Sequence, residues 1–458
     1  MTWTGPPPSA SRRPTVDGRQ ALLILAVAVA LVACVNNESA APSALDTAEV
    51  PTASTGLPLQ PTPASTAAPT PSVTPTPSVT AMPSSTPVSP PISNLGTWQT
   101  APDQESLRGV TFSDVAWTGA RFVAVGSLDD GTGVFLDSTD AVTWHRQSTT
   151  VRNGSAGRIA AGPRGVVAVG STGSHLASWS SADGLSWSKQ RDAFPLPTLG
   201  TDTVTVTDVT VAADRWLAVG RRDPACFIDC GLDPKRSYVW RSSDGLHWTR
   251  IGDQPALKGG GMNAVSRWGD GFVAAGGAAG HAAIWTSPDG GTWSRVPDAP
   301  LFDGQTSGSA RYLGVEATHV GTVGATIAVV GNAYAQDGCP SGVALRFCPG
   351  PRAWWSADGH AWSTAQFAKA RNGQLNAMGV VGDGLLAVGW SEKCSAGVWT
   401  SADAQSWACL SGGPAPQLSD VTVGGSGTVQ VILGELNLAP SEEGDPNWVS
   451  YAWYRTLP

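Results

Sequence analysis

Charge is scarce in this chain, and what is present carries a small acidic excess. Asp, Glu, Lys and Arg make up 14% of the 458 residues, and the formal net charge is −8. A protein that tracks a phosphate backbone needs a basic surface, so the composition argues against nucleic acid as a partner. Long apolar runs are also few. The run Ala21–Ala33, at 13 residues, is too short to span a bilayer as a helix.

Common signatures of catalysis and metal binding are missing too. The sequence has no Gly-x-Ser-x-Gly, His-Glu-x-x-His or phosphate loop, and no Cys-x-x-Cys pair. The six histidines are scattered, and we expect His145, His247 and His360 to be solvated beside turns. One compact grouping, Arg311-Tyr312 with Glu316, is typical of the start of a strand. We therefore expect no metal and no cofactor, and we do not favour an enzyme.

Repetition is what the sequence has in abundance. A short apolar segment ending in glycine occurs seven times, at Val123–Gly126, Val167–Gly170, Leu217–Gly220, Val273–Gly276, Ala328–Gly331, Leu386–Gly389 and Val431–Gly434. Six copies are followed by Ser-x-Asp-x-x-x-Trp, with aspartates Asp140, Asp183, Asp244, Asp289, Asp358 and Asp403. Each unit has the pattern of four short strands separated by turns. The sequence therefore predicts an all-β fold, a seven-bladed β-propeller of four-stranded antiparallel blades.

The seventh unit is one strand short. It supplies Leu418–Gly424, Thr428–Gly434 and Trp448–Tyr454, and then the sequence ends. A spare strand lies at the other end of the domain, where Gly96–Gln99 matches Gly291–Ser294 of the fourth unit. We predict that this N-terminal strand completes the seventh blade and closes the ring, because closure removes two open sheet edges.

The first 94 residues have the pattern of an export signal and a tether. Arg12, Arg13 and Arg19 precede the apolar run, which ends in Leu31-Val32-Ala33-Cys34 and resembles the bacterial lipobox. The resemblance implies cleavage before Cys34 and lipidation of its sulfur; the alternative is an ordinary signal peptide that contains a cysteine. We predict a signal peptide at 1–33, the lipidated Cys34 with a disordered Pro/Thr/Ser-rich tether at 34–94, and the propeller at 95–458. The expected location is extracytoplasmic, lipid-anchored to the bacterial cell membrane.

Six further cysteines are close neighbours in the sequence, Cys226 with Cys230, Cys339 with Cys348, and Cys394 with Cys409. An even set in an exported chain is typical of disulfides. Six cysteines allow about 15 connectivities, so pairing between neighbours is one hypothesis among several.

The best copies of the repeated motif, Ser181–Trp187, Ser242–Trp248 and Ser287–Trp293, resemble the Asp-box, or BNR repeat. The chain is thus similar to the sialidase-like Asp-box propellers, which include sialidases, receptor ectodomains and glycan-cleaving enzymes. The resemblance implies that the six aspartates are structural and lie in turns between strands three and four, away from the active face. The Phe-Arg-Ile-Pro-like segment of sialidases is absent.

Long insertions fall in the loops between strands two and three, at Arg221–Ser237, Asn332–Arg352 and Glu435–Asn447. Long loops on a rigid scaffold often carry binding, although loop drift stabilised by disulfides would give the same pattern. We therefore expect a membrane-anchored lipoprotein whose propeller binds a protein partner or an envelope glycan on this face without catalysis. The alternatives are a sialidase-like glycoside hydrolase and, by analogy of fold alone, an assembly factor for a membrane complex.

Overall fold

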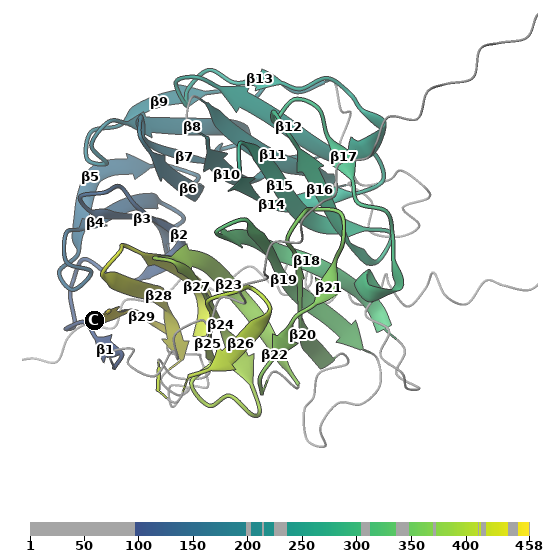
Figure 1. Ribbon diagram of the computed structural model, residues 1–458. Coiled ribbons are helices and arrows are strands. Elements are labelled where there is room, and N and C mark those ends of the chain that lie inside the picture. Colours follow the sequence, from purple (N-terminus) through teal and green to yellow (C-terminus); the bar gives the residue numbers. More distant parts are fainter. Residues whose placement is uncertain are drawn as a thin grey trace, which may run out of the picture. The chain divides into compact units, whose positions relative to one another are not determined.

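The computed structural model describes residues 97–197, 203–212, 215–223, 236–303, 312–335, 348–369, 372–410, 412–413, 418–437 and 448–457. Seven antiparallel sheets are arranged around a central axis, and together they form a seven-bladed β-propeller (Figure 1). The predicted fold class is confirmed. Cys34 and the rest of the predicted signal peptide and tether lie outside the described residues.

The first four blades follow one plan, with the innermost strand first. Blade 1 contains β2 (Val110–Trp117), β3 (Phe122–Leu128), β4 (Gly133–Ser138) and β5 (His145–Val151). Blade 2 contains β6 (Ala156–Gly162), β7 (Gly165–Thr172), β8 (His175–Ser181) and β9 (Ser188–Arg191). Blade 3 contains β10 (Thr203–Val211), β11 (Trp216–Asp223), β12 (Arg236–Ser242) and β13 (Thr249–Arg250). Blade 4 contains β14 (Gly261–Trp268), β15 (Gly271–Ala278), β16 (His281–Ser287) and β17 (Ser294–Arg295).

The last three blades keep the plan with two additions at their edges. Blade 5 contains β18 (Tyr312–Val323), β19 (Thr326–Ala335), β20 (Cys348–Ser356) and β21 (Ser363–Thr364). Blade 6 contains β23 (Gly373–Val381), β24 (Gly384–Ser391), β25 (Val398–Ser401) and β26 (Ser406–Cys409), with β22 (Gln366–Phe367) on its outer edge. Blade 7 contains β27 (Leu418–Gly425), β28 (Val429–Asn437) and β29 (Trp448–Thr456), with β1 (Gln99–Thr100) outside β29.

The N-terminal strand closes the ring, as predicted from the sequence. Gln99 pairs with Tyr454 and Thr100 with Trp453 in an antiparallel ladder. The paired residues follow Trp98 just as β17 follows Trp293, so the expected strand at Gly96–Gln99 lies slightly too early in the chain. The last blade is therefore built from both ends of the propeller sequence.

The outer strand of blade 6 was not expected. The segment between blades 5 and 6 adds β22 in parallel to β26, so this sheet has five strands. Phe367 lies 5.4 Å from Trp399 and 5.1 Å from Trp407, measured between ring centroids. Burial of this phenyl ring between two indoles explains why the connecting segment adheres to the blade edge.

Apolar side chains fill the interfaces between blades. The described residues form seven buried clusters, and each draws its members mainly from two neighbouring blades. The tryptophans of the repeated motif contribute to these interfaces. Trp187 of blade 2 packs 4.5 Å from Phe135 of blade 1 and donates its indole N–H to Gln147 over 2.8 Å. The repeated tryptophan thus joins each blade to the one before it.

Helix is nearly absent from the described residues, where it amounts to two 3-10 turns, η1 (Pro255–Leu257) and η2 (Pro300–Phe302). None of the helices found there has the length and apolar character needed to cross a membrane.

The long loops are shorter than the sequence suggested, because strand pairing continues past the repeated glycine. Arg222 still pairs with Arg236, Ala335 with Cys348, and Asn437 with Trp448. Both ends of the expected loops Arg221–Ser237 and Asn332–Arg352 and the start of Glu435–Asn447 are therefore strand, and residues 224–235, 336–347 and 438–447 lie outside the described residues.

Candidate functional site: a funnel at the centre of the propeller

A β-bulge interrupts the innermost strand at the same place in blades 1 to 6. One residue there has no partner on strand two: Ser113, Gly157, Thr207, Asn263, Thr318 or Asn376. Blade 7 has a wider irregularity between Ser419 and Thr422. Bulges bend a strand and redirect its side chains. In blades 1 to 6 they form a series of six equivalent positions around the axis.

The bulge explains the repeated glycine of strand two. In blade 4 a Cβ added at Gly276 would lie 2.0 Å from the carbonyl oxygen of Gly261, closer than any side chain can approach. The equivalent glycines of the first six blades meet a carbonyl oxygen of the inner strand at 1.9–2.4 Å. Glycine recurs at this position because the bulged backbone leaves no room for a Cβ.

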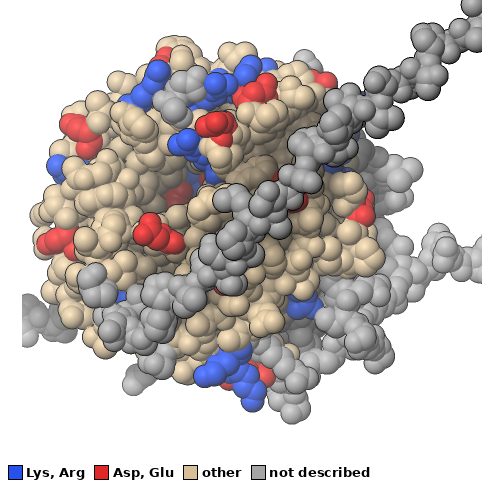
Figure 2. All heavy atoms as spheres, viewed as in Figure 1, with Lys and Arg blue, Asp and Glu red and all other residues tan. Residues whose placement is uncertain are grey.

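All six unpaired bulge residues line a central funnel of about 1240 Å³. Its wall also includes Arg221, Tyr334 and Trp390 near the ends of their second strands, and Trp448 at the start of β29. The funnel therefore opens where strands two and three are connected. The Ser-x-Asp turns join strands three and four, so they lie at the other end of the blades. On the face drawn in Figure 2, acidic and basic side chains are interspersed rather than gathered into a field of one sign.

One arc of the funnel is polar and internally bonded. Arg221 of blade 3 donates to Oδ1 of Asn263 in blade 4, and its Nη1 lies 3.3 Å from Oε1 of Glu316 in blade 5. The Asn263 amide donates to Glu316 Oε1 over 2.8 Å and to the Ala317 carbonyl over 2.9 Å. Three neighbouring blades thus hold the Glu316 carboxylate in one orientation beside the funnel.

The adjoining arc, from blades 6 and 7, carries both tryptophans of the funnel together with four polar side chains, Gln374, Asn376, Ser391 and Glu392. Trp390 and Trp448 are half-buried here, next to three smaller apolar side chains, Leu375, Leu418 and Val421. Neither indole N–H has a hydrogen-bond partner among the described residues. Tryptophan N–H groups generally find a partner when buried, so both indoles remain available to a ligand or to water.

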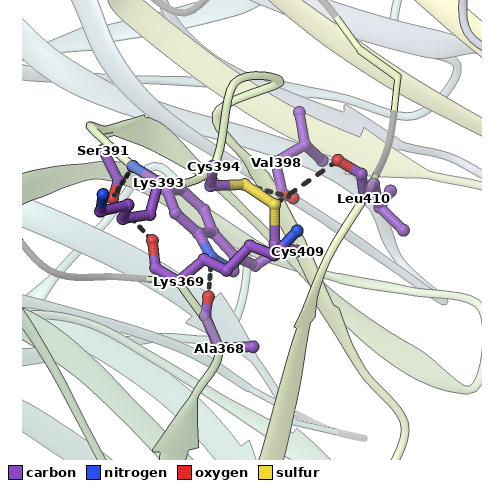
Figure 3. The surroundings of a disulfide bond; sticks show 9 residues. Ala368, Lys369, Ser391, Lys393, Cys394, Val398, Cys409 and Leu410 are labelled. Atoms are coloured by element: carbon purple, nitrogen blue, oxygen red, sulfur yellow. Dashed lines mark hydrogen bonds between the residues drawn. A yellow bond between two sulfur atoms is a disulfide. The ribbon is translucent and has the colours of Figure 1, made fainter.

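A disulfide braces this arc (Figure 3). Cys394, three residues beyond the funnel residue Ser391, is bonded to Cys409 at the end of β26, with a Cα–Cα distance of 5.9 Å. Cys394 is fully buried, and Ser391 donates to the Lys369 carbonyl over 2.6 Å. These bonds fix the strand 2–3 connection of blade 6 at the funnel wall. A segment that is already fixed in the free protein loses little conformational entropy when a ligand binds, so the funnel wall is pre-organised here.

The deep end of the funnel adjoins a second cavity of about 140 Å³, lined in part by Asp114, Asp208, Arg158 and His319. Both carboxylates bond to backbone on two blades. Asp114 accepts from Val115 (2.8 Å) and from Ile159 of the next blade (2.9 Å). Asp208 likewise accepts from Val209 (2.8 Å) and from Val265 (2.7 Å). Each carboxylate therefore ties two inner strands together.

The protein packed around this cavity shifts the pKa values of the side chains that line it. Desolvation raises the pKa of Asp208 to about 7 and also raises the pKa of Asp114, while the Arg158 charge opposes both shifts. Desolvation, assisted by the Arg158 charge, lowers the pKa of His319 to about 4. Because its pKa is lowered, His319 is neutral at pH 7. The side chains of Asp114, Asp208 and His319 are half-buried, so water in the funnel still reaches them.

The aspartates of the repeated motif lie in turns, where they bond to the turn itself. In blade 2, Asp183 Oδ1 accepts from the backbone N–H groups of Leu185 (2.9 Å) and Ser186 (3.0 Å) and from the Ser181 hydroxyl (3.0 Å). The other five make the same bonds, namely Asp140, Asp244, Asp289, Asp358 and Asp403. Among the described residues, no group of three or more His, Cys, Asp or Glu is placed to hold a metal ion.

The structure places the remaining sequence-predicted residues unevenly. Cys226, Cys230 and Cys339 lie outside the described residues, and only the backbone of Cys348 is described. Three histidines expected to be solvated, His145, His247 and His360, are exposed. Glu316 lies in an inner strand, as its grouping suggested, but its side chain lines the funnel.

Most funnel residues were missed by the sequence analysis, which followed the repeats and the long loops. Their signal is positional: in blades 1 to 6 the residue is found by counting from the repeated glycine to its bulged partner on the inner strand. At that position the chain carries serine, glycine, threonine and asparagine, while the opposing glycine does not vary.

The sequence matches the family described as the DUF6242 beta propeller domain over residues 83–337, which is more than half of the chain. A search of curated proteins finds no significant match. Similar solved structures include YCF48 bound to D1 peptide, at 12% identity and a TM-score of 0.47, with 80% of this chain and 96% of that chain covered. Trypanosoma rangeli sialidase with the inhibitor DANA has 12% identity and a TM-score of 0.40, covering 78% and 57%. The arabinofuranosidase Arb93A of Fusarium graminearum has 11% identity and a TM-score of 0.43, covering 78% and 97%. At these identities the likeness concerns the fold alone.

Proposed function

We propose that this chain, which belongs to the DUF6242 beta propeller domain family, is a non-catalytic binding protein of the cell envelope whose central funnel holds the ligand. The observation that carries the proposal is the funnel of about 1240 Å³, ringed by bulge residues on the face where the long loops begin and end. Concave sites in which a few polar groups are held in fixed orientations are typical of ligand binding.

A role without catalysis fits the bonding of the carboxylates. Asp114 and Asp208 each use both oxygens to tie inner strands together. Glu316 is held by Arg221 and Asn263. A general acid or a nucleophile needs a group that is free to exchange a proton or to attack. Asp114 and Asp208 thus join neighbouring inner strands, and one oxygen of Glu316 is held in the network with Arg221 and Asn263.

The envelope location rests on the sequence around Cys34. In this proposal the lipid on Cys34 anchors the protein, and residues 35–94 hold the propeller away from the membrane surface. Cys34→Ala is expected to abolish incorporation of a labelled fatty acid and to release the protein from the membrane fraction. Continued membrane association of unlabelled protein would instead favour an uncleaved signal peptide.

Filling the funnel tests the binding role directly. A Cβ at Gly157 would meet only the Val169 carbonyl oxygen, at 4.0 Å, so Gly157→Trp places an indole in the funnel without a clash at its base. Gly252→Trp is the matched control, because Gly252 is exposed, has no atom within 4 Å of its Cβ and lies outside the funnel.

The readout is crosslinked capture of envelope components by the full-length lipoprotein. We expect wild type and Gly252→Trp to retain the same component and Gly157→Trp to lose it, at unchanged thermal stability. Equal capture by all three proteins would overturn the assignment of binding to the funnel.

A sialidase-like glycoside hydrolase is the second candidate, because Tyr334 and Glu316 line the same funnel. Desolvation and the Glu316 charge raise the pKa of Tyr334, which makes its phenolate harder to form and so weakens it as a nucleophile. Release of a fluorophore from aryl glycosides by wild type, lost in Tyr334→Phe, would establish the hydrolase and refute the non-catalytic role.

A further inference from the structure

We infer that the ligand of the funnel is a neutral saccharide, with a sugar ring stacked on the indoles of blades 6 and 7 and its hydroxyls bonded at Glu316. The inference rests on the proposed function, since it assigns a ligand class to the same site. Three features of the wall carry it: flat indoles with polar groups close by, a rigidly held acceptor, and the balance of charge.

The wall offers contacts for both surfaces of a sugar ring, flat indoles and polar groups close by. A pyranose has an apolar C–H face and an edge of hydroxyl groups. Trp390 and Trp448 offer flat apolar surfaces, and their free indole N–H groups can donate at the ring edge. Trp390 is held in place by the β-ladder, where it pairs with Gln374, and by the neighbouring disulfide. A stacking platform fixed in this way loses little entropy when a ligand binds.

Glu316 supplies the acceptor that a hydroxyl group needs. Its Oε1 accepts from Asn263 (2.8 Å) and faces Arg221, whereas Oε2 has no partner among the described residues. Asn263 uses both of its amide protons on Glu316 and the Ala317 carbonyl, so the carboxylate cannot swing away without breaking that network. Hydrogen bonds to a charged acceptor are stronger than those between neutral groups. The free oxygen is therefore a fixed site for a hydroxyl donor.

The charge balance disfavours an acidic ligand. Among the described residues of the funnel and the cavity below it, four carboxylates face two guanidinium groups: Glu316, Glu392, Asp114 and Asp208 against Arg158 and Arg221. Carboxylates remain in excess even when Asp208 is protonated. An anionic sugar would meet net repulsion in a confined space, whereas a neutral one would not.

The size of the funnel allows more than one sugar residue. Small-molecule sites usually have volumes of roughly 300–1,000 Å³, and this one has about 1240 Å³. We therefore expect affinity to rise with chain length from a monosaccharide to a tetrasaccharide.

The test measures binding of defined saccharides by the full-length protein, using calorimetry and tryptophan fluorescence. The neutral probes are tetrasaccharides of glucose, mannose, galactose and N-acetylglucosamine; the acidic probes are trigalacturonate and sialyllactose. We expect binding of at least one neutral probe and of neither acidic probe. Trp390→Ala and Glu316→Gln should each weaken it about tenfold. Trp117→Ala is the matched control, since Trp117 is half-buried at the opposite end of β2, and it should bind like wild type.

The outcomes separate this inference from the proposed function. Preference for the acidic probes, or neutral binding unaffected by both funnel variants at unchanged fold, would overturn the saccharide assignment. If no saccharide binds but envelope capture remains sensitive to Gly157→Trp, the ligand class is wrong and the funnel still binds. If capture is insensitive as well, the proposed function fails too.

Discussion

The strand that closes the ring should contribute much of the propeller's resistance to unfolding. Besides the two pairings of β1, Trp98 packs against the apolar cluster between blades 6 and 7. The guanidinium of Arg455 lies 4.8 Å from the centroid of its indole. Arg455 is only 2% exposed, and its Nε donates to Gln430 over 2.7 Å. Trp98→Ala removes the indole that packs against this buried guanidinium and weakens the attachment of β1 to β29.

The magnitude follows from burial and from the contact with Arg455. Truncating a fully buried tryptophan costs about 3–5 kcal/mol, so the half-buried Trp98 should contribute roughly half of that, about 2 kcal/mol. A desolvated cation–π contact adds about 1–2 kcal/mol. In a domain of this size 1 kcal/mol corresponds to roughly 1–2 °C, so we expect Trp98→Ala to lower Tm by about 5 °C.

Calorimetry measures the change in Tm, and hydrogen exchange shows where it acts. Trp187→Ala is the matched control, because Trp187 is also half-buried but lies between blades 1 and 2. Both variants should lose stability, but only Trp98→Ala should speed exchange in β27, β28 and β29. Removing residues 35–94 should change neither readout. A Tm within 1 °C of wild type, with exchange in blade 7 unchanged, would refute the argument that closure depends on Trp98.

Three further predictions follow from the turns and bulges. Gly276→Ala should destabilise the propeller by about 3 kcal/mol or prevent folding, because its Cβ would overlap a backbone carbonyl, while Gly252→Ala should be neutral in the same thermal melt. Turn N–H groups hold the pKa of Asp183 at about 2, below its usual value, so its stabilisation is present above about pH 4 and is lost as the pH falls towards 2. Asp183→Asn should therefore lower Tm at pH 7 and reduce the fall of Tm between pH 4 and pH 2. The same fall of Tm in the variant as in wild type would contradict this. Reduction of Cys394–Cys409, which closes a loop of 15 residues, should cost about 3 kcal/mol, and a Tm insensitive to reductant would contradict that.

The arrangement of the blades is predictable from the sequence because the same four-strand pattern is repeated along the chain. The expected strand Leu418–Gly424 differs by one residue from the observed Leu418–Gly425, and the missing strand of blade 7 is supplied by the N-terminal β1. The predicted ends of the second and third strands, beyond the repeated glycine, were wrong. The glycine looks like a strand end in sequence, but in the structure it faces a bulge and the ladder continues past it. Glycine accommodates both situations, so sequence alone does not distinguish them.

The funnel was harder to predict, because its residues are brought together only by closure of the ring. Arg221, Asn263 and Glu316 are separated by 42 and 53 residues, and nothing local in the sequence marks them as neighbours. The parallel β22 was missed for a similar reason. Its two residues carry no strand pattern, and packing of Phe367 between two tryptophans decides its place.

The bulge explains how a repetitive frame can carry a site that is not symmetric. Backbone contact fixes the glycine on strand two, so that position cannot vary without loss of the blade. The unpaired residue opposite it has no partner in the ladder, and its side chain lines the funnel. Some of these side chains also bond to the backbone of the next blade, as Asn376 does to the Leu418 carbonyl. The residue at the bulge therefore differs from blade to blade, whereas the glycine opposite it is the same in blades 1 to 6. At that free position blade 4 carries Asn263, which orients Glu316, and blade 2 carries Gly157, which leaves space. The same bulge, repeated around the axis, thus provides positions at the funnel wall where a ligand specificity can be built one residue at a time.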